Sequence, residues 1–531
     1  MNEWIVIGEE KGKIKLVSKS DENTGILPKG SYITAENDGK RYVLRVDESG
    51  QTEPYSPSPL IIDMDLSPLV QDRKCQNQIY AHRVKDIDPG KRGLVDFIPP
   101  QSKARRSNQE EIDLALGLEE EDRGPPVFIS TIQYATNQIL EDENGKPIVT
   151  FLPRSMFFHQ IMLCGKTGQG KTNATKYLMQ YFAEEMGGAV LAINVKEDDL
   201  LKLYEKTKTT NKKVLGEWEI LGKDAKGLEN FSVYYPATTE LKAAYNLDSE
   251  KCDLQNITLK LEEIEPETLN GLLKGQTTDT ASRLLPDIFR FWKEKYGQNA
   301  RFIDFVRYFM ERGSQKGNVQ FDLQDVRGEI LNEVTIFRST YTNLLNALRD
   351  VSPYFDDDDA KSINEEDIIR PGKVSVIDAT SDEKSVKFAA ILLRHLLKKI
   401  VHAKSSKKFD TPVLIVIDEV HKFYDTDSTT EALDDLDGIC RTGRSMKIGV
   451  IFSSQSPSDI PRGLSSVINT QIFFKTNPDE IKIHGIKLDA TEVESLKRGF
   501  ACGSVFELPQ LKFFKFPLTF CGDAGKGEDN D

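Results

Sequence analysis

A glycine-rich loop between an apolar run and a helix-forming run is the feature that most restricts how this 531-residue chain can fold. Residues 160–164 read QIMLC, residues 165–172 read GKTGQGKT, and residues 171–187 read KTNATKYLMQYFAEEMG. The first run is typical of a strand buried on both faces, and the last has helical periodicity and ends in glycine. A G-x-x-x-x-G-K-T loop in this position is the context of a phosphate-binding P-loop.

The residues of this loop have separate expected roles. The glycines let the backbone curl so that its N–H groups face phosphate oxygens. Lys171 is expected to reach the β- and γ-phosphates, and the hydroxyl of Thr172 is expected to bind Mg²⁺. We therefore predict ATP and Mg²⁺ as ligands. The predicted nucleotide-binding residues are Gly165, Lys166, Thr167, Gly168, Gln169, Gly170, Lys171, Thr172 and Asn173.

Two adjacent carboxylates follow a second apolar run. Residues 413–419 read VLIVIDE, which places Asp418 and Glu419 at the carboxyl end of a predicted buried strand. Asp418 is expected to hold Mg²⁺ through water, and Glu419 to orient and deprotonate the water that attacks the γ-phosphate. Such sheets bind ligands at the carboxyl ends of their strands, so both segments are expected to share one cleft.

Weaker signals lie downstream. Gln455 ends the strand-like run IGVIFSSQ and is a candidate sensor of the γ-phosphate. Arg441 and Arg444 lie between the two acids and that strand, where an arginine can act as a finger on a neighbouring subunit's nucleotide. Asp378 ends the run KVSVID and is expected to have only a supporting role.

Apolar strands alternate with helices from about residue 126, which predicts an α/β domain with a mostly parallel sheet. Before it, short β-rich runs separated by turn signals predict a small antiparallel barrel. The expected divisions are the barrel in 1–100, a linker with one short helix capped by Ser107 or Asn108 in 101–125, the first part of the nucleotide-binding core in 126–250, a helical insertion in 251–365, and the second part with the C-terminal tail in 366–531.

Aromatic residues of the expected insertion, Phe289, Phe291 and Trp292, occur at helical spacing. We interpret them as core residues and not as a platform for stacking bases.

Composition narrows the class of partner. The formal charge of −14 argues against a protein that coats DNA or an anionic membrane with its whole surface, so any nucleic-acid contact must be local. The N-terminal run has only a four-residue apolar patch, and no stretch approaches the ~20 apolar residues of a membrane span. The six cysteines form no CxxC pair, which indicates reduced thiols in a cytoplasmic protein.

With these residues assembled, the chain resembles the HerA branch of the HerA/FtsK family of P-loop ATPases. The resemblance rests on CGKTGQGKTN, VLIVIDEVHKF and GRSMKIGVIFSSQSPSDIP, with NTQIFFKTNPDE following, and the barrel resembles the HAS-barrel that opens HerA-like chains. It implies a RecA-like ATPase core and a homo-hexameric ring that pumps double-stranded DNA through its channel, with a partner nuclease docked on the barrel side.

The resemblance also implies residue roles: Lys171 and Thr172 bind nucleotide and Mg²⁺, Glu419 is the catalytic base, Arg444 is the arginine finger acting in trans, and Gln455 is the sensor. One departure is plain. Family members often carry Arg-His close before the P-loop strand, whereas here Arg154 and His159 are separated, so neither role is carried over.

DNA contact has the weakest support in the sequence. Two local basic clusters, KTKTTNKK at 206–213 and KARR at 103–106, are candidates for phosphate contacts. Sequence-specific recognition is not expected, because the chain has no helix-turn-helix, zinc-finger or RNA-binding signature.

Three functions fit the motifs to different degrees. The first is a motor that moves duplex DNA during end processing or anti-phage defence, and the second is an ATP-gated scaffold that assembles and regulates an effector. The third is a GTPase or small-molecule kinase. It is disfavoured because NVKED at 194–198 lacks the first residue of the guanine-reading motif and a kinase does not need the Asp–Glu pair.

Overall fold

The computed structural model divides the chain into two compact units. Unit 1 comprises Met1–Ser155, Gly168–Gly170 and Ile472–Pro517, and unit 2 comprises Met156–Thr167, Lys171–Gln471 and Leu518–Asp531. The residues that the structure describes are 4–19, 27–52, 76–88, 97–134, 136–142, 144–237, 241, 245–273, 279–314, 317–325, 327–424, 431–477 and 490–522.

Unit 1 begins with a closed antiparallel barrel in the order β1-β2-β5-β4-β3-β6. Along β1, Trp4 and Val6 point inward whereas Ile5 and Ile7 are exposed, the two-residue alternation of a strand with one buried face. The barrel expected from the sequence is therefore confirmed. Its strands are β1 (Trp4–Glu10), β2 (Lys13–Lys19), β3 (Tyr32–Asn37), β4 (Lys40–Thr52), β5 (Gln76–Asp86) and β6 (Lys103–Arg106).

Strand β6 closes the barrel by pairing with β1 and β3, although its residues lie in the range 101–125 that we expected to be a linker. The short helix expected there is α2 (Gln109–Leu116). Of the two candidate caps, Asn108 is the one used: its side chain accepts a hydrogen bond from the backbone N–H of Glu111 (2.9 Å), and the Glu111 carboxylate accepts one from the backbone N–H of Asn108 (3.1 Å).

The rest of unit 1 is built on β7 (Arg123–Gln133), which pairs with three antiparallel neighbours. These neighbours are β8 (Thr136–Ile139), β9 (Val149–Pro153) and β22 (Phe513–Lys515), and β22 pairs in turn with β21 (Phe500–Ser504). Helix α13 (Ala490–Glu494) precedes β21.

Unit 2 is built around a parallel sheet in the order β16-β13-β12-β17-β11-β18-β19-β10, with β20 (Thr470–Phe473) next in the order after β10. Every residue of β10, β11 and β18 is buried, as expected for strands covered on both faces. The mostly parallel α/β fold predicted from the sequence is thus confirmed. The strands are β10 (Gln160–Cys164), β11 (Ala189–Asn194), β12 (Phe231–Pro236), β13 (Asp253–Thr258), β16 (Lys361–Ser362), β17 (Val374–Asp378), β18 (Val413–Asp418) and β19 (Ile448–Ser454).

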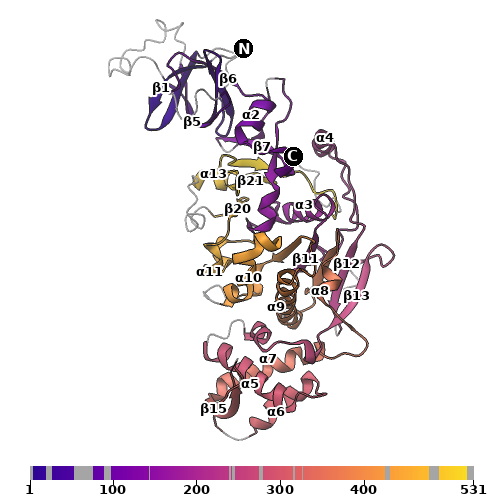
Figure 1. Ribbon diagram of the computed structural model, residues 1–531. Coiled ribbons are helices and arrows are strands. Elements are labelled where there is room, and N and C mark those ends of the chain that lie inside the picture. The colour runs from indigo at the N-terminus through magenta and orange to yellow at the C-terminus, as the bar shows by residue number, and fades with distance from the viewer. Residues whose placement is uncertain are drawn as a thin grey trace, which may run out of the picture. The chain divides into compact units, whose positions relative to one another are not determined.

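Helices cover both faces of this sheet. Figure 1 shows β11 between α3 (Lys171–Glu184) on one side and α9 (Glu383–Ser405) on the other. Helix α10 (Glu431–Met446) packs on α9 and β19. The shorter helices are α4 (Lys212–Leu221), α8 (Glu365–Ile368) and α11 (Arg462–Ser465), with 3-10 turns at Arg154–Phe158, Val420–Lys422 and Pro457–Asp459.

A helical insertion interrupts unit 2 between β13 and β16. Its aromatic core includes Phe289, Phe291 and Trp292, all buried, which confirms that they are core residues. The strands β13 and β16 lie inside the range 251–365 but pair with the sheet. The insertion comprises the 3-10 turns Leu261–Glu263, Pro266–Leu273 and Ser352–Tyr354, helices α5 (Asp279–Tyr296), α6 (Phe302–Arg312) and α7 (Arg338–Val351), and a hairpin of β14 (Val319–Gln324) and β15 (Ile330–Ile336).

Among the described residues, no helix combines the length and the apolar character needed to cross a bilayer. The cysteines whose side chains are described, Cys164, Cys252, Cys502 and Cys521, are buried free thiols. Cys75 and the acidic end of the C-terminal tail lie outside the described residues.

Candidate nucleotide-binding site

Strand register brings the glycine-rich loop and the two acids to the same edge of the sheet. At the carboxyl end of β10, Cys164 is level with Ser454 of β19, and Asp418 of β18 is level with Ser453 of the same strand. Only β19 therefore separates the strand that enters the loop from the strand that ends in Asp418. The shared edge predicted from the sequence is present within unit 2.

The loop has the backbone conformation that its glycines permit. Gly168 and Gly170 have φ angles of 78° and 114°, a region that residues with a side chain rarely adopt. The loop begins with a hydrogen bond of 3.3 Å from the N–H of Gly165 to the carbonyl of Ser454. This turn leads directly into α3, whose N-terminus favours an anionic ligand.

Lys171 is buried at the start of α3, with 5% of its surface exposed. Its ammonium group donates to the carbonyls of Gly165 and Lys166 in its own loop. Burial lowers the pKa of Lys171, and the positive charge of Lys196 lowers it further. A buried cation that has only carbonyl oxygens as hydrogen-bond acceptors gains free energy from an anion, so this environment suits a phosphate oxygen.

Oxygen ligands suited to Mg²⁺ lie at the same edge. Asp418 is buried at the end of β18, and Thr172 is half-buried in the first turn of α3. Burial raises the pKa of Asp418, whereas the charge of Lys196 and a hydrogen bond from Ser453 act in the opposite direction. A buried carboxylate of this kind gains from a divalent cation, and Mg²⁺ prefers such hard oxygen donors.

Glu419 has an unusual backbone conformation for a residue with a long side chain. Its φ and ψ angles are 51° and 58°, in the left-handed region, and its side chain is 1% exposed. Such a conformation costs of order 1–3 kcal/mol and is typical of functional sites. The buried carboxylate lies next to Lys196, in the loop after β11, and Gln455, which follows β19.

One carboxylate oxygen of Glu419, Oε1, has two partners. The ammonium group of Lys196, in the loop after β11, donates to it, and Nε2 of Gln455 at the end of β19 donates over 3.2 Å. Burial raises the pKa of Glu419, but the hydrogen bond and charge of Lys196 outweigh burial and hold the pKa below its usual value. The structure thus brings Glu419 and Gln455 together and adds Lys196.

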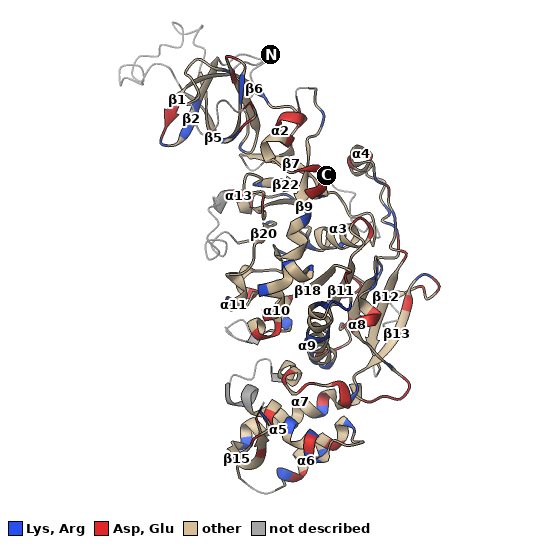
Figure 2. Ribbon diagram, in the orientation of Figure 1, with Lys and Arg blue, Asp and Glu red and all other residues tan. Residues whose placement is uncertain are grey.

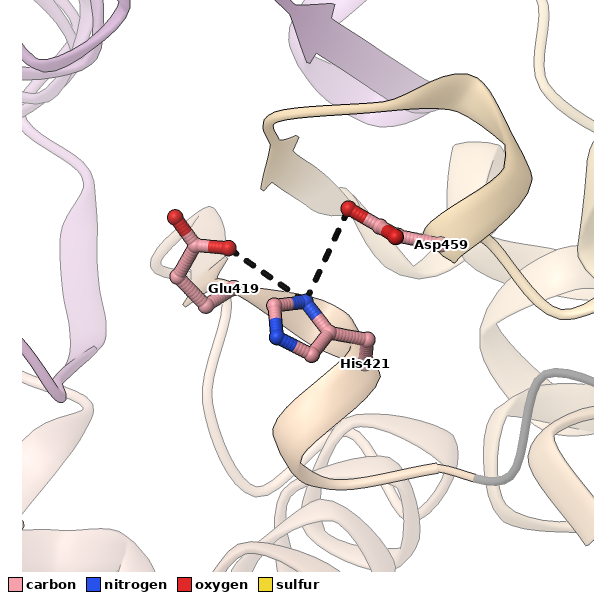
Figure 3. A group of neighbouring side chains, drawn as sticks. All are labelled: Glu419, His421 and Asp459. Atoms are coloured by element: carbon pink, nitrogen blue, oxygen red, sulfur yellow. Dashed lines mark ion pairs between the residues drawn. The ribbon is translucent and has the colours of Figure 1, made fainter. Parts of the chain in front are cut away.

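The other oxygen of Glu419 faces His421. Figure 3 shows the imidazole between Glu419 and Asp459, with Nδ1 3.3 Å from Oε2 of Glu419 and 3.7 Å from Oδ2 of Asp459. The ligand atoms of these residues lie within 4.8 Å of one another, a spacing that a metal ion could bridge.

Two observations disfavour a second metal at this place. Oδ2 of Asp459 already accepts hydrogen bonds from the hydroxyl of Ser454 and the N–H of Ser456. The ammonium group of Lys196 already neutralises Glu419. We therefore interpret His421 as a close polar neighbour of Glu419 and Asp459, although neither Oε2 of Glu419 nor Nδ1 of His421 has a hydrogen-bond partner among the described residues.

Two further sequence candidates have defined positions. Asp378 accepts hydrogen bonds from Asn194 at the end of β11 (3.3 Å) and from Thr380, and its supporting role stays a prediction. His159 precedes β10 and contacts Asn469 (2.9 Å), at the edge opposite the glycine-rich loop.

The two candidate arginines of α10 differ in their partners. Nε of Arg441 pairs with Asp437 on the same helix. Arg444 is exposed, and within the described part of the chain no carboxylate forms an ion pair with it. Of the two, Arg444 therefore has the guanidinium group that is available to a neighbouring molecule.

Sequence reasoning assigned no role to Lys196, His421 or Asp459. The signal that could have found Lys196 is positional, because polar residues at the carboxyl ends of neighbouring parallel strands meet at one edge. His421 and Asp459 lie two residues after Glu419 and four residues after Gln455, but their meeting depends on the pairing of β18 with β19.

A family match covers the part of this site that holds the glycine-rich loop and Lys196, and it ends before Asp418, Glu419 and Gln455. Residues 142–396 match the family model described as the central domain of helicase HerA. Two curated relatives carry the name DNA double-strand break repair helicase HerA. The protein from Sulfurisphaera tokodaii is 28% identical over 216 residues, which are 38% of this chain and 40% of that protein. The protein from Pyrococcus furiosus is 22% identical over 405 residues, which are 68% of this chain and 66% of that protein.

Solved structures with a similar chain path include VirB4 of Thermoanaerobacter pseudethanolicus and the bacterial conjugative coupling protein TrwB. VirB4 has a TM-score of 0.43 and 12% identity and covers 75% of this chain and 96% of its own. The unbound monoclinic form of TrwB has a TM-score of 0.45 and 13% identity and covers 76% of this chain and 96% of its own. The fold assignment rests on the strand order described above.

Proposed function

We propose that this HerA-like chain is an ATPase that hydrolyses Mg²⁺-bound ATP at the edge of the unit 2 sheet. The observation that carries the proposal is the register of β10, β19 and β18, which brings the loop of Lys171 level with Asp418 and Glu419. A loop of this kind binds phosphate, and a neighbouring acid pair supplies a metal ligand and a base.

The residues present fit the nucleotide and its metal ion. Lys171 would bind the β- and γ-phosphates, and Thr172 and Asp418 would hold Mg²⁺. When bound, Mg²⁺ neutralises charge on the phosphate oxygens. The buried ammonium of Lys171 and the buried carboxylate of Asp418 each gain an opposite charge in this arrangement.

Glu419 accepts the proton of the attacking water, whose oxygen bonds to the γ-phosphorus as the bond to the β,γ-bridging oxygen breaks. Its lowered pKa keeps the carboxylate ionised at neutral pH, as a base requires. Gln455 donates to the same carboxylate and is suited to sense the γ-phosphate next to it. Arg444 is proposed to act on the nucleotide of a neighbouring subunit.

For the larger assembly we propose a homo-hexameric ring that moves double-stranded DNA without sequence preference, with a partner nuclease or effector on the barrel. The motif resemblance and the HerA name of two curated relatives support this proposal. DNA end processing agrees with the names of those relatives, and anti-phage defence is a second setting for the same motor.

The basic segment 206–213 is our candidate for phosphate contacts with DNA. Its lysines are exposed, and the segment leads into α4, which Figure 2 labels. The other basic cluster, KARR, has fewer available charges because Arg105 pairs with Glu111 and Glu36. Lysine and arginine that neutralise DNA phosphates make binding salt-dependent, so lysine-to-alanine changes in 206–213 are expected to reduce that dependence.

The test compares two variants with wild type. Lys171→Ala is expected to lose nucleotide binding, whereas Glu419→Gln is expected to bind ATP and fail to hydrolyse it. Binding is measured with a fluorescent ATP analogue and hydrolysis by phosphate release. Lys202→Ala is a matched control, since Lys202 pairs with Asp198 in the loop after β11 and has no proposed role. Normal turnover by Glu419→Gln would refute the assigned base.

A second measurement separates the motor from an ATP-gated scaffold. Duplex DNA is expected to stimulate hydrolysis by a motor, which should displace a protein block bound to that DNA. If ATP binds and assembles a partner but DNA changes neither the hydrolysis rate nor the position of the block, the scaffold is the correct function.

A further inference from the structure

Lys196 forms an ion pair with the proposed base, although no motif assigns it a role. It lies two residues after the end of β11, and its Nζ donates to Oε1 of Glu419. The Lys196 side chain is 30% exposed, whereas the carboxylate that it contacts is 1% exposed. Lys196 therefore reaches from the open side of the site to a buried acid.

Lys196 also shares an electrostatic environment with the P-loop lysine. Its charge lowers the pKa of Lys171 and of Glu419, and it opposes the rise that burial causes in the pKa of Asp418. Two ammonium groups and two carboxylates thus face one small region at the sheet edge. A polyanion bound there would repel Glu419 and attract Lys196, because opposite charges at short range interact strongly away from bulk water.

We propose that Lys196 is a second phosphate-binding lysine that exchanges partners, pairing with Glu419 in the absence of a triphosphate and with the terminal phosphate of ATP when it is bound. The exchange frees Oε1 of Glu419 to accept the proton of the attacking water. This inference rests on the proposed function, since it names a residue of that same site.

The other partners of Glu419 do not make this exchange. Gln455 is neutral and donates over 3.2 Å, so it can remain on the carboxylate while a water enters. His421 faces the second oxygen, Oε2. Among the described residues, Lys196 is the one that brings a full positive charge to the oxygen that Gln455 also contacts, so its departure leaves that oxygen with a neutral donor.

Loss of Lys196 is expected to weaken the binding of ATP and not the binding of ADP, because ADP lacks the terminal phosphate. Lys196→Ala is expected to weaken binding of a non-hydrolysable ATP analogue by roughly tenfold or more while ADP binding changes little. The matched control is Lys202→Ala, which removes a lysine of similar exposure from the same loop and is expected to leave both affinities unchanged.

A double-mutant cycle tests the exchange itself. Glu419→Gln removes the charge that competes for Lys196 and also the repulsion between Glu419 and the triphosphate, so it is expected to strengthen binding of the ATP analogue more in the presence of Lys196 than in the Lys196→Ala background. Lys196→Met, which keeps the aliphatic chain, is the second variant if Lys196→Ala unfolds.

The outcomes distinguish this inference from the proposed function. If wild type binds neither nucleotide, the proposed function fails. If wild type binds and hydrolyses ATP but Lys196→Ala weakens ATP and ADP equally, or neither, only the role of Lys196 is wrong. Additive effects in the double-mutant cycle would likewise refute the exchange.

Discussion

The backbone N–H of Thr519 donates a hydrogen bond of 2.7 Å to the side-chain oxygen of Asn173, one residue after Thr172 in the first turn of α3. Two further hydrogen bonds hold the same segment: Lys176 of α3 donates to the carbonyl of Gly522 (2.7 Å), and the indole N–H of Trp218 on α4 donates to the carbonyl of Leu518 (2.9 Å). The segment 518–522 therefore holds the start of α3 in place, and that start carries three of the predicted nucleotide-binding residues, Lys171, Thr172 and Asn173.

We predict that Phe520→Ala destabilises unit 2 and weakens ATP binding. The ring of Phe520 is largely buried against Tyr177 and Trp218, with centroid separations of 5.8 Å and 5.6 Å. Removing a buried aromatic side chain costs about 3–5 kcal/mol. Urea unfolding and ATP titration measure the two effects, and Leu215→Ala on the exposed side of α4 is the control. An unchanged free energy of unfolding would show that the segment 518–522 does not stabilise α3.

His421→Ala is expected to lower the hydrolysis rate roughly tenfold without changing ATP affinity. The reason is that His421 faces the base and Asp459, so its loss affects the position of Glu419 and not the binding of phosphate. Steady-state rates and ATP titration separate the two quantities. His402→Ala removes an exposed histidine of α9 and serves as the control. A loss of ATP affinity with a normal rate would contradict the assignment.

Mixing Arg444→Ala subunits with wild-type subunits is expected to lower the hydrolysis rate by more than the mutant fraction, because an arginine finger acts on the nucleotide of the neighbouring subunit. Activity is measured as a function of the mutant fraction at constant total protein. Arg441→Ala is the matched control on the same helix, since Arg441 pairs with Asp437. A loss of activity strictly proportional to the fraction of Arg444→Ala subunits would exclude action in trans.

Unit 2 is expected to lose stability as the pH falls below neutral because of His395 on α9. Burial lowers the pKa of this 2% exposed histidine from 6.5 to about 4, and the charge of Lys399 acts in the same direction. Between these values the unfolded chain binds a proton that the folded chain does not. The stabilisation is therefore complete above the unfolded pKa and is lost as the pH falls toward the folded one. The other charged groups near His395 are Glu263, Glu265, Glu365 and Lys398.

The expected loss is about 1 kcal/mol between about pH 7.5 and about pH 5.5, from the two pKa values of this one group. Urea unfolding at the two pH values measures it. His395→Gln cannot take up a proton, so the variant is expected to lose less stability than wild type over the same interval. An equal loss in both proteins would assign the pH dependence to other groups.

Much of the fold could be predicted from local patterns. The barrel and the parallel sheet were predicted because strands with one buried face alternate and strands with two buried faces are apolar throughout, as in β1 and β18. Strands without either pattern were not predicted. In β6, KARR, one residue in four is buried, and β13, DLQNIT, has its buried residues only at its end. Hydrogen bonds between backbones hold these strands in place, and such pairing leaves no pattern of apolar residues in the sequence.

The sequence by itself determined the phosphate-binding loop, because its glycines, lysine and threonine act through a backbone conformation that spans only eight residues, 165–172. It also determined that Asp418 and Glu419 end a buried strand. Tertiary structure alone decided that Lys196, Gln455 and His421 meet at the Glu419 carboxylate. The physical reason is that these contacts depend on the order and register of β11, β18 and β19, which bring together residues more than 200 positions apart in the case of Lys196 and Glu419.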